Sequence, residues 1–236
     1  MDQLHRTGCL CGRGHNWPRR DFVRSGIGGL IASAAIGAAF PKLACAQTTL
    51  APDAALQALL DGNARFAKYQ LTSCSNDLAL LKQNTVAKQE PFAAVLSCAD
   101  SRVPVELVFD QSIGQLFVTR VAGNIASPDI IASLEYGAAV LGTKAILVLG
   151  HSNCGAVKAA MAGKAVPGQI SALYAPIQPA VEVAGGNLEA AIKANAKNQA
   201  NLLATASPVL AGLIQQGNLK VAAGYYALDT GTVTLL

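Results

Sequence analysis

Short apolar runs without a single polar side chain alternate with helical segments along this chain, and this alternation constrains its fold most strongly. Residues 92–96 (FAAVL) and 145–149 (AILVL) are two such runs. A strand with one solvent-exposed face would alternate polar and apolar residues, so continuous apolar runs indicate strands that are buried on both faces. Strands of this kind, separated by helices, predict an α/β fold with a mainly parallel sheet and helices on both of its faces.

The same pattern assigns most of the chain after residue 46 to regular elements. Strands are expected over 92–96, 116–121, 145–149, 219–226 and 232–236. Helices are expected over 52–69, 78–86, 127–141, 188–206 and 208–216, with a further helical stretch from Gly155 and a loop or short helix over 163–179. No internal repeat divides this part of the sequence, which is therefore predicted to form one domain, 47–236.

Residues 1–46 have the features of an export signal. Arg19 and Arg20 precede an uncharged run from Ser25 to Phe40, and residues 44–46 (ACA) offer the small side chains that a signal peptidase needs. Paired arginines before a weakly apolar run predict a twin-arginine signal and a periplasmic or otherwise exported protein. An ordinary secretory signal, a retained anchor or a lipoprotein signal at Cys45 are the alternatives. The run is too short and too weakly apolar for a stable transmembrane helix. The protein is therefore not expected to have a stable membrane span after the signal is removed.

Dividing the chain at residue 46 changes the meaning of its net charge of +4. The first 46 residues carry six basic and two acidic side chains, which leaves twelve of each sign in the remainder. Nucleic acids are recognised through basic surfaces, so a formally neutral domain is not expected to bind one.

Three reactive residues follow the ends of two predicted strands. Cys98 comes directly after the run 92–96 and Ser97, while His151 and Cys154 follow the run 145–149. Ligand sites of parallel sheets lie beyond the carboxyl ends of the strands, so these side chains should meet. Two thiolates and one imidazole suit Zn²⁺, and three protein ligands with an open fourth position are typical of catalytic zinc sites. Taken singly, each cysteine could also be a core residue and the histidine a loop residue.

The wider motifs around these residues resemble those of a known family. They read Cys98-Ala-Asp-Ser-Arg102 and His151-Ser-Asn-Cys154, and the chain resembles the β-class carbonic anhydrases, whose hallmarks are C-x-D-S-R and H-x-x-C. The resemblance covers nearly all of residues 50–236. It implies a lyase with one Zn²⁺ per chain, bound by Cys98, His151 and Cys154, in which zinc-bound hydroxide converts carbon dioxide reversibly to bicarbonate and a proton.

The resemblance also implies roles for four further residues. Asp100 matches the acidic partner at the fourth zinc position, and Arg102 matches its salt-bridge mate. A closed state, in which Asp100 is itself the fourth ligand, remains open. Gln89 matches a glutamine that lies beside the substrate, and Phe117 matches an apolar wall residue.

At the level of architecture, the resemblance implies four parallel strands with an added antiparallel edge strand. It also implies a homodimer or a dimer of dimers, in which helix 52–69 wraps the partner because its apolar face is otherwise hard to bury. Two other functions remain open. The chain could be a related enzyme whose zinc-bound hydroxide attacks carbon disulfide or carbonyl sulfide. It could also be a noncatalytic zinc protein that senses redox state through its thiolates.

Overall fold

The computed structural model describes residues 48–73, 82–83 and 85–236. The predicted export signal lies outside these residues, as does part of the helix predicted over 78–86. Among the helices that are described, none combines the length and the hydropathy needed to cross a membrane.

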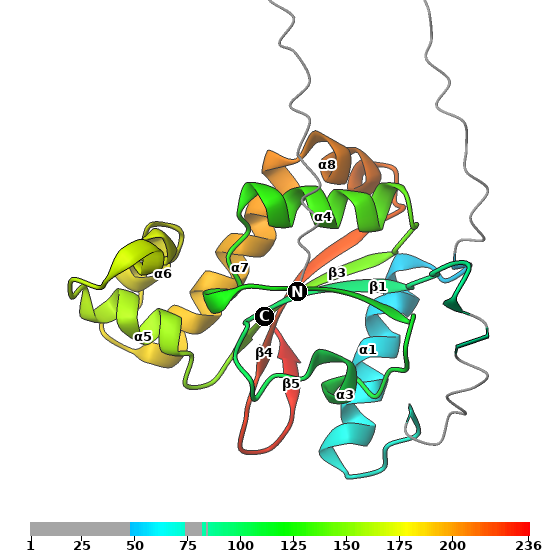
Figure 1. The fold of residues 1–236 in the computed structure, drawn as a ribbon, viewed down its shortest axis with the longest axis horizontal. Coiled ribbons are helices and arrows are strands. Elements are labelled where there is room, and N and C mark those ends of the chain that lie inside the picture. Colours follow the sequence, from blue (N-terminus) through cyan, green and yellow to red (C-terminus); the bar gives the residue numbers. More distant parts are fainter. Residues whose placement is uncertain (1–47, 74–81, 84) are drawn as a thin grey trace, which may run out of the picture. The chain divides into compact units, whose positions relative to one another are not determined.

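A five-stranded sheet in the order β2-β1-β3-β4-β5 forms the centre of this part of the chain (Figure 1). The strands are β1 (Ala93–Ser97), β2 (Leu116–Arg120), β3 (Ala145–His151), β4 (Lys220–Tyr226) and β5 (Val233–Leu235). The first four are parallel, and β5 pairs antiparallel with β4. The predicted fold of four parallel strands with an antiparallel edge strand is therefore confirmed.

Helices cover both faces of the sheet. One face carries α1 (Pro52–Ala67) and α3 (Val105–Val108), and the other carries α4 (Pro128–Ala139), α7 (Leu188–Ala206) and α8 (Pro208–Gln215). Between β3 and α7 the chain forms α5 (Gly155–Ala162), the 3₁₀ helix η4 (Gly168–Leu173) and α6 (Tyr174–Val183). These elements lie beyond the carboxyl end of β3, where α5 and α6 pack against α7.

Strands β1 and β3 are buried along their whole length. Val95 and Leu147 belong to the core beneath α1, while their neighbours Leu96 and Val148 belong to the core beneath α7. Alternate side chains of a strand point to opposite faces, so both faces need apolar residues here. This explains why the sequence has continuous apolar runs instead of an alternating pattern.

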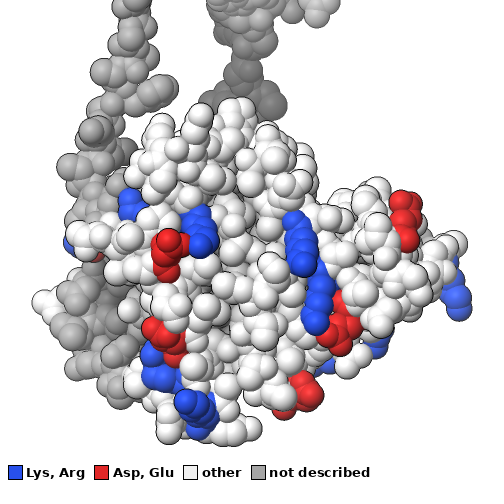
Figure 2. All heavy atoms as spheres, turned by 180° about the vertical axis from the view of Figure 1, so that it is seen from behind, with Lys and Arg blue, Asp and Glu red and all other residues white. Residues whose placement is uncertain are grey.

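Basic and acidic side chains are mixed on the surface. On the face seen in Figure 2, Lys and Arg lie beside Asp and Glu, and much of the area between them carries no charge. This mixture agrees with the equal numbers of basic and acidic residues after residue 46.

The structure corrects the expectation for the helix predicted over 52–69. Its apolar face lies on the chain's own sheet, where Ala55, Leu56 and Leu59 are buried in one core with Val95 and Leu147. The reason given for a wrapped partner, an apolar face that a single chain could not bury, is therefore wrong.

Candidate metal centre

Two adjacent parallel strands bring Cys98, His151 and Cys154 together. Ser97 of β1 pairs with Leu149 of β3, so the residues that follow these positions lie side by side. The possible ligand atoms of the three residues all lie within 4.8 Å of one another, and the two sulfurs are 4.0 Å apart. All three side chains are buried. The expectation that the strand ends unite these residues is confirmed.

The turn between His151 and Cys154 lets two side chains of one short segment face the same point. Asn153 adopts a left-handed conformation with φ of 58°, which asparagine tolerates better than most residues. Cys154 then precedes the first residue of α5. The positive end of a helix dipole favours an ionised thiol at this position.

One nitrogen of His151 is buried and, within the described part of the chain, lacks a hydrogen-bond partner. Nδ1 lies 2.9 Å from the carbonyl oxygen of Ser152, which can only accept, so Nδ1 carries the hydrogen. Nε2 then presents a lone pair and has no hydrogen-bond partner among the residues that the structure describes, although the side chain is fully buried. A buried polar atom of this kind is costly unless a ligand satisfies it. The histidine therefore fits a metal ligand, held in the required tautomer by its neighbour.

Ser152 is itself held in place by β4 and the residues after it. Its N–H donates to the carbonyl oxygen of Tyr226, and its Oγ accepts from the N–H of Leu228, both at 2.9 Å. These two contacts hold Ser152, whose carbonyl oxygen orients His151. The sequence alone did not point to a role for Ser152.

The two thiols of the cluster differ in acidity because they are hydrogen-bonded to each other. Hydrogen bonds from the thiol of Cys154 and from the N–H of Gly123 lower the pKa of Cys98 to about 4, although burial opposes this. The pKa of Cys154 is raised because it donates to Cys98 and is buried. A divalent cation between the sulfurs favours both thiolates, so the donor set fits such an ion.

Asp100 and Arg102 lie at the edge of the cluster and are joined by three hydrogen bonds. The Arg102 side chain donates from Nε to Oδ1 at 2.9 Å and from Nη2 to Oδ2 at 2.7 Å, and its backbone N–H donates to Oδ1. The Arg102 side chain holds the pKa of Asp100 well below its usual range, against the opposing effect of burial. The ionised carboxylate has Oδ2 3.8 Å from Nε2 of His151.

Arg120 fixes the loop that carries Cys98 and Asp100. It ends β2 beside β1, and its side chain donates to the carbonyl oxygens of Cys98 at 3.1 Å and Asp100 at 2.6 Å. The sequence alone did not point to a role for Arg120. Its place at the end of a strand next to β1 was the signal that could have found it.

Gln89 and Phe117 do not lie at the cluster within one chain. Gln89 precedes β1 whereas Cys98 follows it, and five strand residues alone separate the two ends by roughly 16 Å. Gln89 instead lines a surface pocket with Ile113 and Tyr136, among other residues. Phe117 is near the start of β2, with its ring 6.3 Å from that of Tyr136. Their predicted contact with substrate could be made only at the cluster of another chain.

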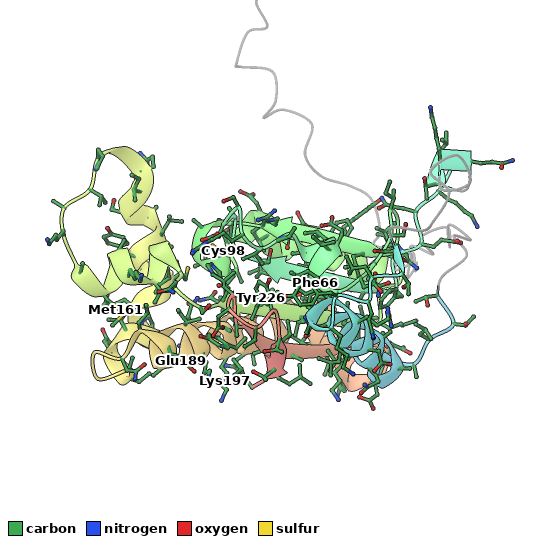
Figure 3. The ribbon with its side chains drawn as sticks, turned by 90° about the horizontal axis from the view of Figure 1, so that it is seen from below. Phe66, Cys98, Met161, Glu189, Lys197 and Tyr226 are labelled. Carbon is green, nitrogen blue, oxygen red and sulfur yellow. The ribbon has the colours of Figure 1, made fainter. Side chains whose placement is uncertain are left out.

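The apolar surroundings of the cluster come from the elements beyond the sheet. Cys98 and Cys154 share a core with Ile177 of α6 and Ile192 of α7, and Met161 of α5 packs against it. Figure 3 labels Cys98 at the end of the sheet and Met161 in the neighbouring helical region. The cluster is thus walled by protein on the side of α5 and α6.

Comparison with known proteins identifies the family. Residues 93–233 match the family described as carbonic anhydrase. Carbonic anhydrase 2 of Mycobacterium tuberculosis is 34% identical over 196 residues, which cover 78% of this chain and 92% of that protein. The chain belongs to the β-class carbonic anhydrase family. This family consists of zinc enzymes, and the Cys-His-Cys cluster described above is able to bind that ion.

Solved carbonic anhydrase structures share the fold. A Coccomyxa β-carbonic anhydrase in complex with acetazolamide is 27% identical with a TM-score of 0.60, and the match covers 77% of this chain and 86% of that one. Two β-carbonic anhydrases of Sordaria macrospora, described as tetrameric, agree in fold. The match has a TM-score of 0.62 at 23% identity and covers 77% of this chain and 96% of that one.

Proposed function

We propose that this chain hydrates carbon dioxide reversibly to bicarbonate and a proton at a zinc ion held by Cys98, His151 and Cys154. The observation that carries the proposal is the unpartnered, buried Nε2 of His151, which shares a 4.8 Å cluster with two thiol sulfurs. An ionised carboxylate, that of Asp100, lies 3.8 Å from the same nitrogen. Membership of the carbonic anhydrase family supports the choice of reaction.

In this reaction hydroxide adds to the carbon of carbon dioxide. Zinc, when bound, supplies the Lewis acidity that makes hydroxide available near neutral pH. Asp100 accepts a hydrogen bond from the hydroxyl hydrogen of the nucleophile and so directs an oxygen lone pair toward the carbon. His151 contributes a neutral nitrogen, because its other nitrogen donates to Ser152. The sequence after residue 46 has no other histidine, so we expect water or buffer to carry the proton away.

Arg102 supports an open fourth position instead of the closed state. Both oxygens of Asp100 accept hydrogen bonds from the guanidinium of Arg102, and these bonds oppose movement of the carboxylate onto the metal. A purely structural zinc site would need neither residue. The pair therefore also counts against the noncatalytic alternative.

We further propose that the enzyme is a homodimer or a dimer of dimers in which each copy completes the site of another. Val86, Ile113 and Tyr136 are exposed beside Gln89, with 78%, 59% and 46% of their surface accessible. A second copy that covers this apolar surface would bury it. The Gln89 of one copy would then reach the Cys-His-Cys cluster of the other. The Gln89 amide would then hydrogen-bond a substrate oxygen, and Phe117 would form an apolar wall.

We also propose export by a twin-arginine signal, supported by Arg19, Arg20 and the weakly apolar run after them. Replacing both arginines by lysine should keep the protein in the cytoplasmic fraction, whereas the wild-type chain should appear outside it. Export of the double variant at the wild-type level would contradict this signal type.

Stopped-flow measurement of carbon dioxide hydration by the zinc-loaded protein tests the function. We expect catalysis by the wild type, and a loss of about 100-fold or more in Asp100→Asn with zinc content unchanged. Equally slow hydration by both proteins at full zinc occupancy would refute the catalytic proposal. Turnover of carbon disulfide without hydration of carbon dioxide would point to the related sulfur chemistry instead.

A further inference from the structure

A backbone N–H from the loop after β2 donates to one of the cluster sulfurs. This loop forms the short helix η3 (Ala122–Asn124), and the N–H of Gly123 lies 3.3 Å from Sγ of Cys98. Gly123 has φ of 75°, and a Cβ added to it would lie 2.7 Å from Cδ1 of Ile177. Only glycine satisfies both constraints. Because glycine is also the most flexible residue, something else must hold its peptides in this orientation.

Two amide side chains of α7 hold this loop at both of its ends. Nδ2 of Asn195 donates to the carbonyl oxygen of Gly123 at 2.9 Å. One helical turn later, Oε1 of Gln199 accepts from the N–H of Ala126, also at 2.9 Å. Two hydrogen bonds thus attach the loop from Gly123 to Ala126 to α7. The side chain of Asn195 donates one of them, and the side chain of Gln199 accepts the other.

Gln199 also orients Asn195. Its Nε2 donates to Oδ1 of Asn195 at 3.2 Å and to the carbonyl oxygen of Pro176 in α6 at 3.0 Å. With Oδ1 of Asn195 occupied as an acceptor, its amide nitrogen must point toward Gly123. The two amides therefore form one connected network instead of two independent contacts.

The position of these amides in the core is unusual for polar side chains. Asn195 is fully buried and Gln199 is 3% exposed. They share one face of α7 with the apolar residues Ile192, Ala196 and Leu203, while Glu189 and Lys197, labelled in Figure 3, are on the exposed side. Helix α7 also lies close to β3, since a Cβ at Gly150 would be 3.0 Å from Ile192. A face that only packed against the sheet would be expected to be apolar.

We propose that Asn195 is a positioning residue for the metal centre. Oriented by Gln199, it anchors the peptide on one side of Gly123, while the peptide on the other side gives its N–H to the Cys98 sulfur. This hydrogen bond fixes the position of the sulfur at the metal centre and draws charge from it. The inference rests on the metal site of the proposed function and does not depend on the reaction catalysed there.

Metal binding by the purified protein tests this role without any activity assay. Co²⁺ serves as the probe, because thiolate-to-cobalt charge-transfer bands report on the sulfurs and chelator competition reports on affinity. In Asn195→Leu we expect the affinity for Co²⁺ to fall about 10- to 100-fold. The charge-transfer band should also move to lower energy, because a sulfur without its N–H donor holds its electrons less tightly.

The same substitution at Asn63 is a matched control. Asn63 is also buried, in α1 on the other face of the sheet, and its side chain bonds Val108, Gly231 and Val233. Asn63→Leu should lower thermal stability but leave the affinity and the cobalt spectrum unchanged. If Asn195→Leu does not fold, the smaller Asn195→Ala, which also lacks the amide donor, takes its place and should show the same two changes.

Three outcomes would overturn the proposal. One is a folded Asn195 variant with wild-type cobalt affinity and spectrum. Another is a shift in Asn63→Leu as large as that in the Asn195 variant, since loss of stability alone would then explain both. A wild-type protein that binds no Co²⁺ would refute the metal site of the proposed function and this inference with it, which distinguishes that failure from a failure of Asn195 alone.

Discussion

The guanidinium of Arg102 meets the carboxylate of Asp100 in parallel, with one nitrogen on each oxygen at 2.9 and 2.7 Å. The two residues are only two positions apart, and the backbone N–H of Arg102 adds a third hydrogen bond. The orientation of the carboxylate beside His151 therefore depends on a local turn and one side chain. A conservative substitution of Arg102 can therefore test whether this orientation matters.

Arg102→Lys should lower kcat/KM for carbon dioxide hydration about 10- to 100-fold while leaving the zinc content unchanged. Lysine keeps the positive charge but cannot engage both carboxylate oxygens with a planar fork. Metal analysis and stopped-flow assays on the same samples check both parts. Lys220→Gln, which breaks the exposed pair with Asp53, is the control and should keep full activity. Full activity of Arg102→Lys would contradict a role for bidentate binding.

Arg120→Met should weaken zinc binding itself, by about 10-fold or more, because the carbonyl oxygens of Cys98 and Asp100 lose their donors. Chelator competition measures this affinity. Arg120→Lys can still donate to one of the carbonyl oxygens and should recover part of the loss. Unchanged zinc affinity in Arg120→Met would mean that the loop after β1 keeps its shape without this side chain.

The strands and the three cluster residues can be predicted from sequence because their signals are local. A continuous apolar run identifies both β1 and β3, and the carboxyl ends of parallel strands then bring Cys98 and His151 to one edge of the sheet. The bidentate contact of Asp100 with Arg102 also lies within a few residues. Such features depend on chain direction and short-range geometry, which a sequence states directly.

The residues that support the cluster depend on contacts between distant segments. Gly123 reaches Cys98 across 25 positions, and Asn195 reaches Gly123 across 72. Their sequence signal was nevertheless present, since Asn195 and Gln199 interrupt the apolar face of α7 at a spacing of one turn. In α1 the amphipathic pattern indicates that one face is buried, but it does not indicate which chain buries that face.

A second carboxylate, that of Asp110, is buried away from the cluster and tied to the segment after α1. It accepts hydrogen bonds from Arg65, from the N–H and hydroxyl of Thr72, and from the N–H of Ser73. Burial raises the pKa of Asp110, but these donors outweigh it and hold the pKa well below its usual range. The ionised form therefore stabilises the fold.

Asp110→Asn should lower the free energy of unfolding at pH 7 by about 2 kcal/mol, because its NH₂ group would face either the Arg65 guanidinium or the backbone N–H groups of Thr72 and Ser73, none of which can accept a hydrogen bond. A folded-state pKa below the unfolded value of about 3.9 gives stability that is present above that value and lost as the pH falls below it. The gap between wild type and variant should therefore narrow between pH 5 and pH 3 in denaturant titrations. Asp53→Asn, at an exposed ion pair, should change stability by less than about 0.5 kcal/mol. A gap that stays constant over this range would show that the Asp110 charge contributes nothing.

The positions of Gln89 and Cys98 at opposite ends of β1 lead to a test of the shared site. If Gln89 acts at the cluster of a second copy, Asp100→Asn and Gln89→Leu each spoil every site when expressed alone. In a mixture of the two, co-expressed in equal amounts, a site is intact when it has Asp100 from one chain and Gln89 from the other. Random assembly makes this so for about a quarter of the sites, in dimers and in dimers of dimers alike. We therefore expect the mixture to recover about a quarter of wild-type activity, well above either variant alone. If Gln89 acted within its own chain, no combination would contain an intact site, and the mixture would show only the average of its two parents.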